Sequence, residues 1–210
     1  MNDQKSLWDK AHSEGQIHHY SKTPTDFALK VLSLIPSGSK VLELGCGVGN
    51  DSIAFAEAEH KILATDLSEV AVLQNSQRFN EVPNLKFKTL DINQPFQMEE
   101  NSYDVVYARL SLHYFKDSVT RRIFNDIYNV LKPGGILCFM CKSTNDALYG
   151  KGDKIEDDMF ENEGHVRHFF SKDYAKKCLE NTFKIIEIEE KTELLYGKSS
   201  SFIEAIAQKP

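Results

Sequence analysis

Three glycines on alternate positions, Gly45, Gly47 and Gly49, follow an apolar run at 41–44, and the acidic Glu43 stands two positions before the first of them. Glycine has no Cβ, so a ligand can approach the backbone closely where glycines cluster. A helical pattern begins after Gly49, and the first N–H groups of a helix have no partner within it. This stretch therefore predicts a ligand site at the end of a strand.

Asp66 is a second acidic residue suited to the same ligand, because it ends the next apolar run, 21 residues after Gly45. A carboxylate there can accept hydrogen bonds from both hydroxyls of a ribose. Dinucleotides and S-adenosylmethionine both carry such a ribose. The dinucleotide fingerprint requires glycine at position 50, where this chain has Asn50. Glu43 also favours a ligand with a cationic amine, since a carboxylate repels a pyrophosphate.

These residues must be positioned by strands that alternate with helices. The expected strands are 41–44, 61–65, 86–89, 103–108 and 136–141. The expected helices between them are about 50–58, 68–80 and 118–131. Such alternation indicates βαβ units with right-handed crossovers, and hence a doubly wound parallel sheet. Ligands bind these sheets at the carboxyl ends of the strands, where the glycines and Asp66 are expected to lie.

Further elements flank this pattern. Thr23 and Pro24 predict the start of a helix that runs to Ile35, with Thr23 as its N-cap. Residues 142–169 show no clear period, which predicts a long irregular loop of the kind that covers a binding site or is disordered. A helix at 171–181 follows. The runs 183–189 and 202–207 have no helix between them and predict an antiparallel hairpin.

Together these motifs resemble those of class I S-adenosylmethionine-dependent methyltransferases, over about residues 24–210. "VLELGCGVGN" is similar to the family's first motif, "TLDINQPF" to its adenine-binding segment, "YDVVYARLSLHYF" to its fourth-strand segment and "LKPGG" to its turn before the fifth strand. The resemblance implies an α/β Rossmann-like fold: a doubly wound, seven-stranded, mainly parallel sheet with a C-terminal antiparallel hairpin. It also implies a domain at 23–210 with a lid insertion at 142–170, and an N-terminal segment, 1–22, that covers the cofactor.

The same resemblance implies which residues line S-adenosylmethionine. Glu43 faces its amine, Asp66 its ribose and Asp91 its adenine amino group, while Ile92 flanks the ring. The full implied set is Tyr20, Glu43, Gly45, Cys46, Gly47, Asn50, Asp66, Leu67, Asp91, Ile92, Arg109 and Leu110.

The class of methyl acceptor follows from exclusions and from the lid. Enzymes that methylate exocyclic amines of bases carry Asn/Asp-Pro-Pro-Tyr/Phe after the fourth strand, where this chain has Ala108–Ser111. The Pro-Cys nucleophile of cytosine C5 enzymes is also absent from that place, and the spacings assemble no carboxylate cluster for a metal. The lid sequence resembles that of small-molecule members related to the tellurite-resistance and thiopurine methyltransferases. This implies a small-molecule acceptor, often a soft nucleophile.

Two groups of residues are candidates for chemistry at the acceptor. His113 and Tyr114 follow the fourth strand, and His113 can orient or deprotonate a substrate. The alternative is that His113 only caps or shapes the cofactor site. His165, Arg167 and His168 lie in the lid and can bind an anionic group of the substrate. The alternative there is a solvated loop.

Composition limits the other interpretations. The formal net charge is −6, which argues against nucleic acid as a partner. No stretch approaches the ~20 apolar residues of a membrane helix, and the N-terminus has no apolar targeting segment. Cys138 and Cys141 lie three apart on a strand, so they face opposite sides of the sheet and favour core packing over a metal or redox pair. A cytoplasmic protein with free thiols is expected, and the sequence leaves its oligomeric state undetermined.

Three alternatives remain open at this point. The chain could methylate protein or RNA, or bind S-adenosylmethionine without catalysis. A nicotinamide oxidoreductase is the third, and Asn50 and the terminal hairpin disfavour it.

Overall fold

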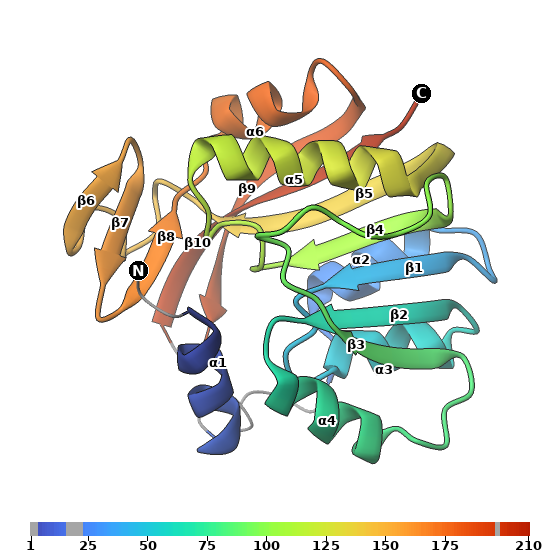
Figure 1. The fold of residues 1–210 in the computed structure, drawn as a ribbon. Coiled ribbons are helices and arrows are strands. Elements are labelled where there is room, and N and C mark those ends of the chain that lie inside the picture. Colours follow the sequence, from blue (N-terminus) through green and yellow to red (C-terminus); the bar gives the residue numbers. More distant parts are fainter. Residues whose placement is uncertain (1–3, 16–22, 196–197) are drawn as a thin grey trace.

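A seven-stranded sheet covered by helices forms the body of the protein in the computed structural model (Figure 1), which describes residues 4–15, 23–195 and 198–210. The strands are β1 (Lys40–Leu44), β2 (Lys61–Asp66), β3 (Leu85–Thr89), β4 (Tyr103–Arg109), β5 (Leu131–Lys142), β9 (Lys184–Leu195) and β10 (Lys198–Gln208). Their order is β3-β2-β1-β4-β5-β10-β9, and β10 pairs antiparallel with both of its neighbours. The predicted doubly wound sheet with a C-terminal antiparallel hairpin is confirmed.

Apolar helix faces cover both sides of this sheet. On one side, α2 (Asp26–Leu34) and α3 (Asn50–Glu57) contribute Phe27 and Phe55 to one core cluster. On the other side, α5 (Asp117–Val130) and α6 (Lys172–Leu179) contribute Phe124 and Leu179 to a second cluster. Cys138 belongs to the first cluster and Cys141 to the second, and both thiols are free. These two cysteines therefore pack in the core on opposite faces, as the strand period predicts.

The start of α2 differs from the sequence prediction. Thr25, not Thr23, is the N-cap, because its Oγ1 accepts a hydrogen bond from the Ala28 N–H at 3.2 Å. Asp51 of α3 accepts from the Thr25 N–H at 2.8 Å and from its hydroxyl at 2.9 Å. A tertiary contact thus decides between two threonines that are both good caps, each worth about 1 kcal/mol.

The stretch expected to be an irregular loop contains a three-stranded antiparallel sheet instead. Its strands are β6 (Asp153–Glu156), β7 (Met159–Asn162) and β8 (His165–His168). Glu163 (φ 53°) and Gly164 (φ 81°) turn the chain between β7 and β8, as in hairpin turns with two left-handed residues. The sequence pattern missed this sheet because each strand has only four residues and one left-handed turn position is a glutamate. We call residues 142–170 the lid.

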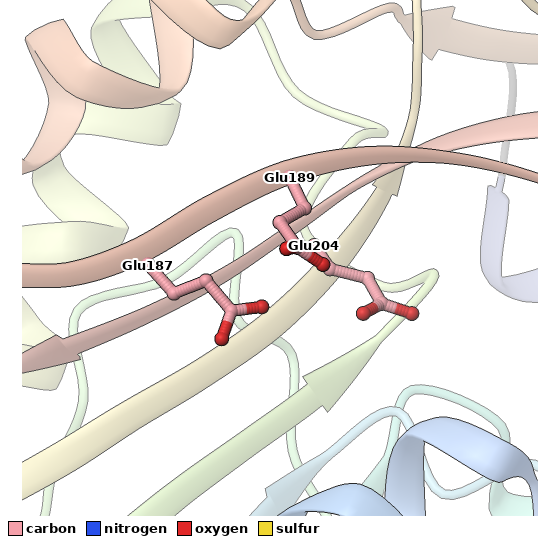
Figure 2. A group of neighbouring side chains, drawn as sticks. All are labelled: Glu187, Glu189 and Glu204. Carbon is pink, nitrogen blue, oxygen red and sulfur yellow. The ribbon is translucent and has the colours of Figure 1, made fainter.

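The terminal hairpin brings three carboxylates together, from Glu187 and Glu189 of β9 and Glu204 of β10 (Figure 2), within 4.8 Å of one another. Two ammonium groups meet them. Lys191 lies 2.8 Å from Glu204, and Lys30 of α2 lies 3.3 Å from Glu204 and also contacts Glu187. Glu204 is only 2% exposed, so these lysines offset the cost of burying its charge. The cluster is therefore an ion-pair network that joins α2 to the hairpin.

The remaining helices lie near the carboxyl ends of the parallel strands. α4 (Glu69–Arg78) packs on β2 and β3, and α1 (Gln4–Ser13) packs on α4 (Figure 1). The sequence had predicted a covering segment at 1–22 but no helix in it. Within the described ranges, no helix is long and apolar enough to cross a membrane.

Candidate functional site

The glycine loop that joins β1 to α3 is fixed by bonds to two neighbouring segments. Gly45 has φ +81°, and a Cβ on it would lie 2.5 Å from the Cβ of Ser111, so no side chain fits. The N–H groups of Gly45 and Cys46 both donate to the Thr65 carbonyl at 2.8 Å. Ser111, which follows β4, donates its hydroxyl to the Leu44 carbonyl. The loop therefore has a defined shape before any ligand binds.

Gly47 faces open space beside Asp66. A Cβ on Gly47 (φ +53°) would meet nothing within 4 Å. The Gly47 N–H donates to one carboxylate oxygen of Asp66 at 2.8 Å, and the Ser68 N–H donates to the other at 2.9 Å. Burial raises the pKa of Asp66, while these two bonds oppose the shift. A carboxylate can accept about four hydrogen bonds, so Asp66 keeps acceptor capacity toward this space. These residues fit a cofactor that carries a ribose.

Glu43 lies buried near the glycine loop. It is 3% exposed, and Ser52 of α3 donates a hydrogen bond to its carboxylate. Burial, and then the charge of Asp51, raise the pKa of Glu43 to about 8. The carboxyl is therefore largely protonated at neutral pH. A cationic amine next to it would favour its ionised form. The contact of Glu43 with the cofactor amine stays a prediction.

Four other predicted cofactor residues lie at the ends of β3 and β4. Asp91 accepts a hydrogen bond from a backbone N–H two residues on. Ile92 is buried, with its carbonyl bonded to the Arg122 guanidinium at 2.8 Å. Leu110 adopts φ +56°, which is uncommon for a non-glycine residue and associated with functional sites. Arg109 has an Nε that is buried without a hydrogen-bond partner among the described residues.

The rest of the predicted cofactor set lies on the loops around Gly47. Cys46 is 8% exposed, and burial raises the pKa of its thiol well above the usual range, so it is not a thiolate. Asn50 is the first residue of α3, and Leu67 directly follows β2. Tyr20 lies outside the described residues and its contact with the cofactor stays a prediction.

One side of α1 attaches to the loop after β2. Asp9 accepts a hydrogen bond from the Ser68 hydroxyl at 2.6 Å. His12 is 2% exposed and close enough to Asp66 for its charge to lower the carboxyl pKa. The described part of the N-terminal segment therefore lies beside the proposed ribose acid.

The other side of α1 contacts the lid. Trp8 lies edge-on to Tyr114 with 5.6 Å between ring centroids, and its ring centroid is 5.5 Å from that of His165. Gln4 donates its amide N–H to the Gly164 carbonyl at 3.0 Å. Three segments far apart in the sequence thus form one aromatic wall.

His113 is placed behind this wall. It is 1% exposed, and its ring centroid lies 4.5 Å from that of Tyr114. Burial, and then the charges of Arg167 and Lys142, lower the pKa of His113 well below its usual range. Its Nδ1 is buried with no hydrogen-bond partner in the described part of the chain. His113 is therefore neutral at pH 7, and its surroundings disfavour the protonated ring.

His168 is separated from the other lid candidates. Its Nδ1 lies 3.3 Å from the Phe115 carbonyl, and its ring centroid is 4.4 Å from that of Tyr174. A cavity of about 420 Å³ opens on that side. Its acidic lining residues are Asp117, Glu156, Asp157, Asp158 and Asp173. The structure thus brings Arg167 close to both His113 and His165. The His168 N–H donates to the His113 carbonyl at 2.8 Å, while the His168 ring borders the acidic cavity.

Several residues that hold the site were missed in the sequence. Asn75 of α4 donates to the Gly47 carbonyl at 2.8 Å, and Tyr107 of β4 donates to Asp51 at 2.7 Å. Ser111 had a usable signal, since it is a polar residue just after a buried strand. Asn75 and Asp51 had none, because their partners are remote in the chain.

Comparison with known proteins gives three consistent findings. Residues 41–135 match a family model described as a methyltransferase domain. The chain is 31% identical over 110 residues to phosphoethanolamine N-methyltransferase 1 of Triticum aestivum. This match covers 50% of the chain and 22% of the Triticum protein. The chain is 27% identical over 168 residues to a tRNA N(3)-methylcytidine methyltransferase of Drosophila melanogaster, covering 73% of this chain and 51% of that protein. The chain therefore spans about half or less of these relatives.

A solved structure shares the fold. The 1,6-didemethyltoxoflavin-N1-methyltransferase of Burkholderia thailandensis, with bound 1,6-didemethyltoxoflavin and S-adenosylhomocysteine, has a TM-score of 0.77 and 16% sequence identity. The match covers 98% of this chain and 87% of that chain.

Proposed function

We propose that the protein is a class I S-adenosylmethionine-dependent methyltransferase that transfers the methyl group of this cofactor to a small-molecule acceptor. The methyltransferase-domain match at 41–135 and the shared fold support the proposal. The observation that carries the proposal is the open space at Gly47, which the Asp66 carboxylate borders with free capacity to accept hydrogen bonds. α1 and the lid close the region beyond it through the contacts of Trp8. The contact of α1 with the lid over this region favours an acceptor of small size.

The chain's residues hold the cofactor at distinct points in this proposal. Asp66 binds the ribose hydroxyls, and Asp91 binds the adenine amino group beside Ile92. Glu43 meets the amine, and its protonated state in the free protein means that binding releases a proton. Arg109 supplies a buried donor beside the methionine part.

The chemistry needs little from the protein beyond placement. Bound S-adenosylmethionine supplies a methyl group on a positively charged sulfur, with a neutral thioether as the leaving group. The acceptor would supply the lone pair that takes this methyl group by in-line displacement, and the chain's residues would place that lone pair. Trp8 and Tyr114 help exclude water, and the site orients the acceptor. Neutral His113 would accept a hydrogen bond from an N–H, O–H or S–H acceptor and so orient it, and Tyr114 packs on the His113 ring. The proton that the acceptor loses would pass to solvent when the product leaves.

An RNA acceptor is the second candidate, and the Drosophila relative is the observation that favours it. The net charge of −6 counts against it, because nucleic-acid binding draws on basic surface. The absence of a nucleic-acid partner and the cytoplasmic location stay predictions from the sequence.

Calorimetric titration with S-adenosylmethionine and S-adenosylhomocysteine tests the cofactor, with NAD as the control ligand. We expect micromolar affinity, about −8 kcal/mol, for both adenosyl ligands and no heat with NAD. Asp66→Ala should weaken binding sharply in a protein that still unfolds cooperatively. A folded wild-type protein that binds neither adenosyl ligand refutes the proposal.

Formation of S-adenosylhomocysteine then tests the acceptor. Thiols, selenite, tellurite, amines, phenols and tRNA are offered separately. Turnover with tRNA alone would favour the second candidate. Binding without turnover on any of them would favour a non-catalytic protein.

A further inference from the structure

Four buried polar atoms without a hydrogen-bond partner gather where α1, the segment after β4 and the lid meet. These atoms, which have no partner among the residues that the structure describes, are Gln4 Oε1, His113 Nδ1, His165 Nδ1 and Arg167 Nε. Leaving such an atom unpaired costs about 1–3 kcal/mol, and native proteins hold few of them. Several in one place indicate that a polar ligand belongs there.

The electrostatics of this place are positive. The charge of Arg167 is close enough to lower the pKa of His113, of His165 and of Lys142. Lys142 is already paired, since its Nζ lies 2.7 Å from Asp146. In the part of the chain that the structure describes, no carboxylate lies within 4.0 Å of Arg167. Among the described residues, Arg167 thus has no carboxylate partner within 4.0 Å, and its buried Nε has no hydrogen-bond acceptor.

The two faces of the lid strand β8 carry different charged and titratable side chains. Neighbouring side chains of a strand point to opposite faces, so His165 and Arg167 share one face of β8, and His168 lies on the other. His168 borders the acidic cavity, with Asp117 and Asp158 in its lining. In the described part of the chain, none of the acids of that cavity forms an ion pair with Arg167 within 4.0 Å. On the His165 side, the charge of Glu163 raises the pKa of His165, a smaller influence than that of Arg167.

We propose that the methyl acceptor carries a carboxylate or phosphate group, which Arg167 binds from the lid with His113 and His165 beside it. The planar guanidinium fits both groups, because it can donate two parallel hydrogen bonds to a pair of oxygens. Trp8 and Tyr114 then face the less polar part of the acceptor. This inference rests on the proposed function and names its substrate class.

Trp8 provides a direct readout. It is the only tryptophan of the chain, and its ring lies 5.5 Å from that of His165. Protein saturated with S-adenosylhomocysteine is titrated with inorganic phosphate, with malonate and with uncharged malonamide, while Trp8 fluorescence is recorded. Phosphate and malonate separate the two kinds of anion. Malonamide matches malonate in size without its charge.

Arg167→Gln is compared with Arg121→Gln, which removes an arginine of similar kind from an exposed pair with Asp117. We expect one of the two anions to bind at least tenfold more tightly than malonamide, and Arg167→Gln to lose at least tenfold of that affinity. Arg167→Lys should recover part of it. Arg121→Gln should behave as wild type, and all variants should keep their S-adenosylhomocysteine affinity within about twofold.

Each outcome separates this inference from the proposed function. If S-adenosylhomocysteine binds but the anions bind no better than malonamide, or Arg167→Gln binds them as wild type does, the anionic acceptor is refuted and the methyltransferase proposal stands. If wild type fails to bind S-adenosylhomocysteine, the proposed function is refuted. In that case, anion binding to the protein without S-adenosylhomocysteine tests the Arg167 site independently.

Discussion

Substituting Gly47 by alanine separates the fold from the cofactor site, because the structure leaves room for a methyl group there. The added Cβ would meet nothing within 4 Å. The N–H bond to Asp66 and the bond from Asn75 to the Gly47 carbonyl both use backbone atoms of Gly47, so they persist. The cost to folding is that alanine must adopt φ +53°. A left-handed residue that is not glycine costs roughly 1–2 kcal/mol.

Gly47→Ala should also weaken binding of the cofactor, for a separate reason. The methyl group would occupy the space into which we place the cofactor, and overpacking of this sort costs about 1–3 kcal/mol. At 1.4 kcal/mol per factor of ten, this corresponds to about 5- to 150-fold weaker binding of S-adenosylhomocysteine. Calorimetric titration measures that loss, and denaturant unfolding measures the change in stability.

Gly38→Ala is the matched control. Gly38 has φ +74°, and a Cβ on it would also meet nothing within 4 Å. It lies in the turn before β1, at the opposite end of that strand from the glycine loop. The variant should lose a similar amount of stability and keep wild-type affinity. If Gly47→Ala bound S-adenosylhomocysteine as tightly as Gly38→Ala does, the cofactor would not approach this backbone and the site assignment would be wrong.

Three further predictions concern buried groups around the site. The folded Glu43 carboxyl keeps its proton up to about pH 8, and the unfolded one only up to about 4.5. The free energy of unfolding that this carboxyl contributes is therefore lost as the pH rises between these values. Glu43→Gln should remove up to about 4 kcal/mol of the drop in unfolding free energy between pH 5 and pH 8, measured by denaturant unfolding. Tyr107→Phe removes the 2.7 Å bond to Asp51 and should lower the free energy of unfolding by about 1–2 kcal/mol. Burial and the nearby guanidinium lower the pKa of His165. Trp8 fluorescence should therefore be quenched only at a pH below that at which a free histidine titrates, and His165→Gln should abolish this quenching.

Each of these has a plain contrary result. An unchanged pH slope in Glu43→Gln would mean that the folded carboxyl is ionised. Wild-type stability in Tyr107→Phe would mean that Asp51 is held by Thr25 alone. A quenching step that survives His165→Gln would assign it to another group.

The sequence alone predicted the sheet, which is confirmed, and it named the residues that we propose for the cofactor side of the site. Local signals sufficed for both predictions, because the hydrophobic period of a strand or helix can be recognised within a few residues. The glycine loop, Asp66 and Asp91 each stand at or just after the end of such an element. Parallel strands put their carboxyl ends on one edge of the sheet, so residues at those ends converge without further information.

Only the tertiary structure decided the acceptor side. Thr25 became the cap of α2 through Asp51, 26 residues away. Arg167 lies close enough for its charge to act on His113 because the lid folds as a small sheet whose turns use left-handed residues, a feature with no clear pattern in the chain. Which face of β8 carries a residue depends on register, and a shift of one position would exchange Arg167 for His168. The sequence could name both as candidates, whereas their separation required the packed fold.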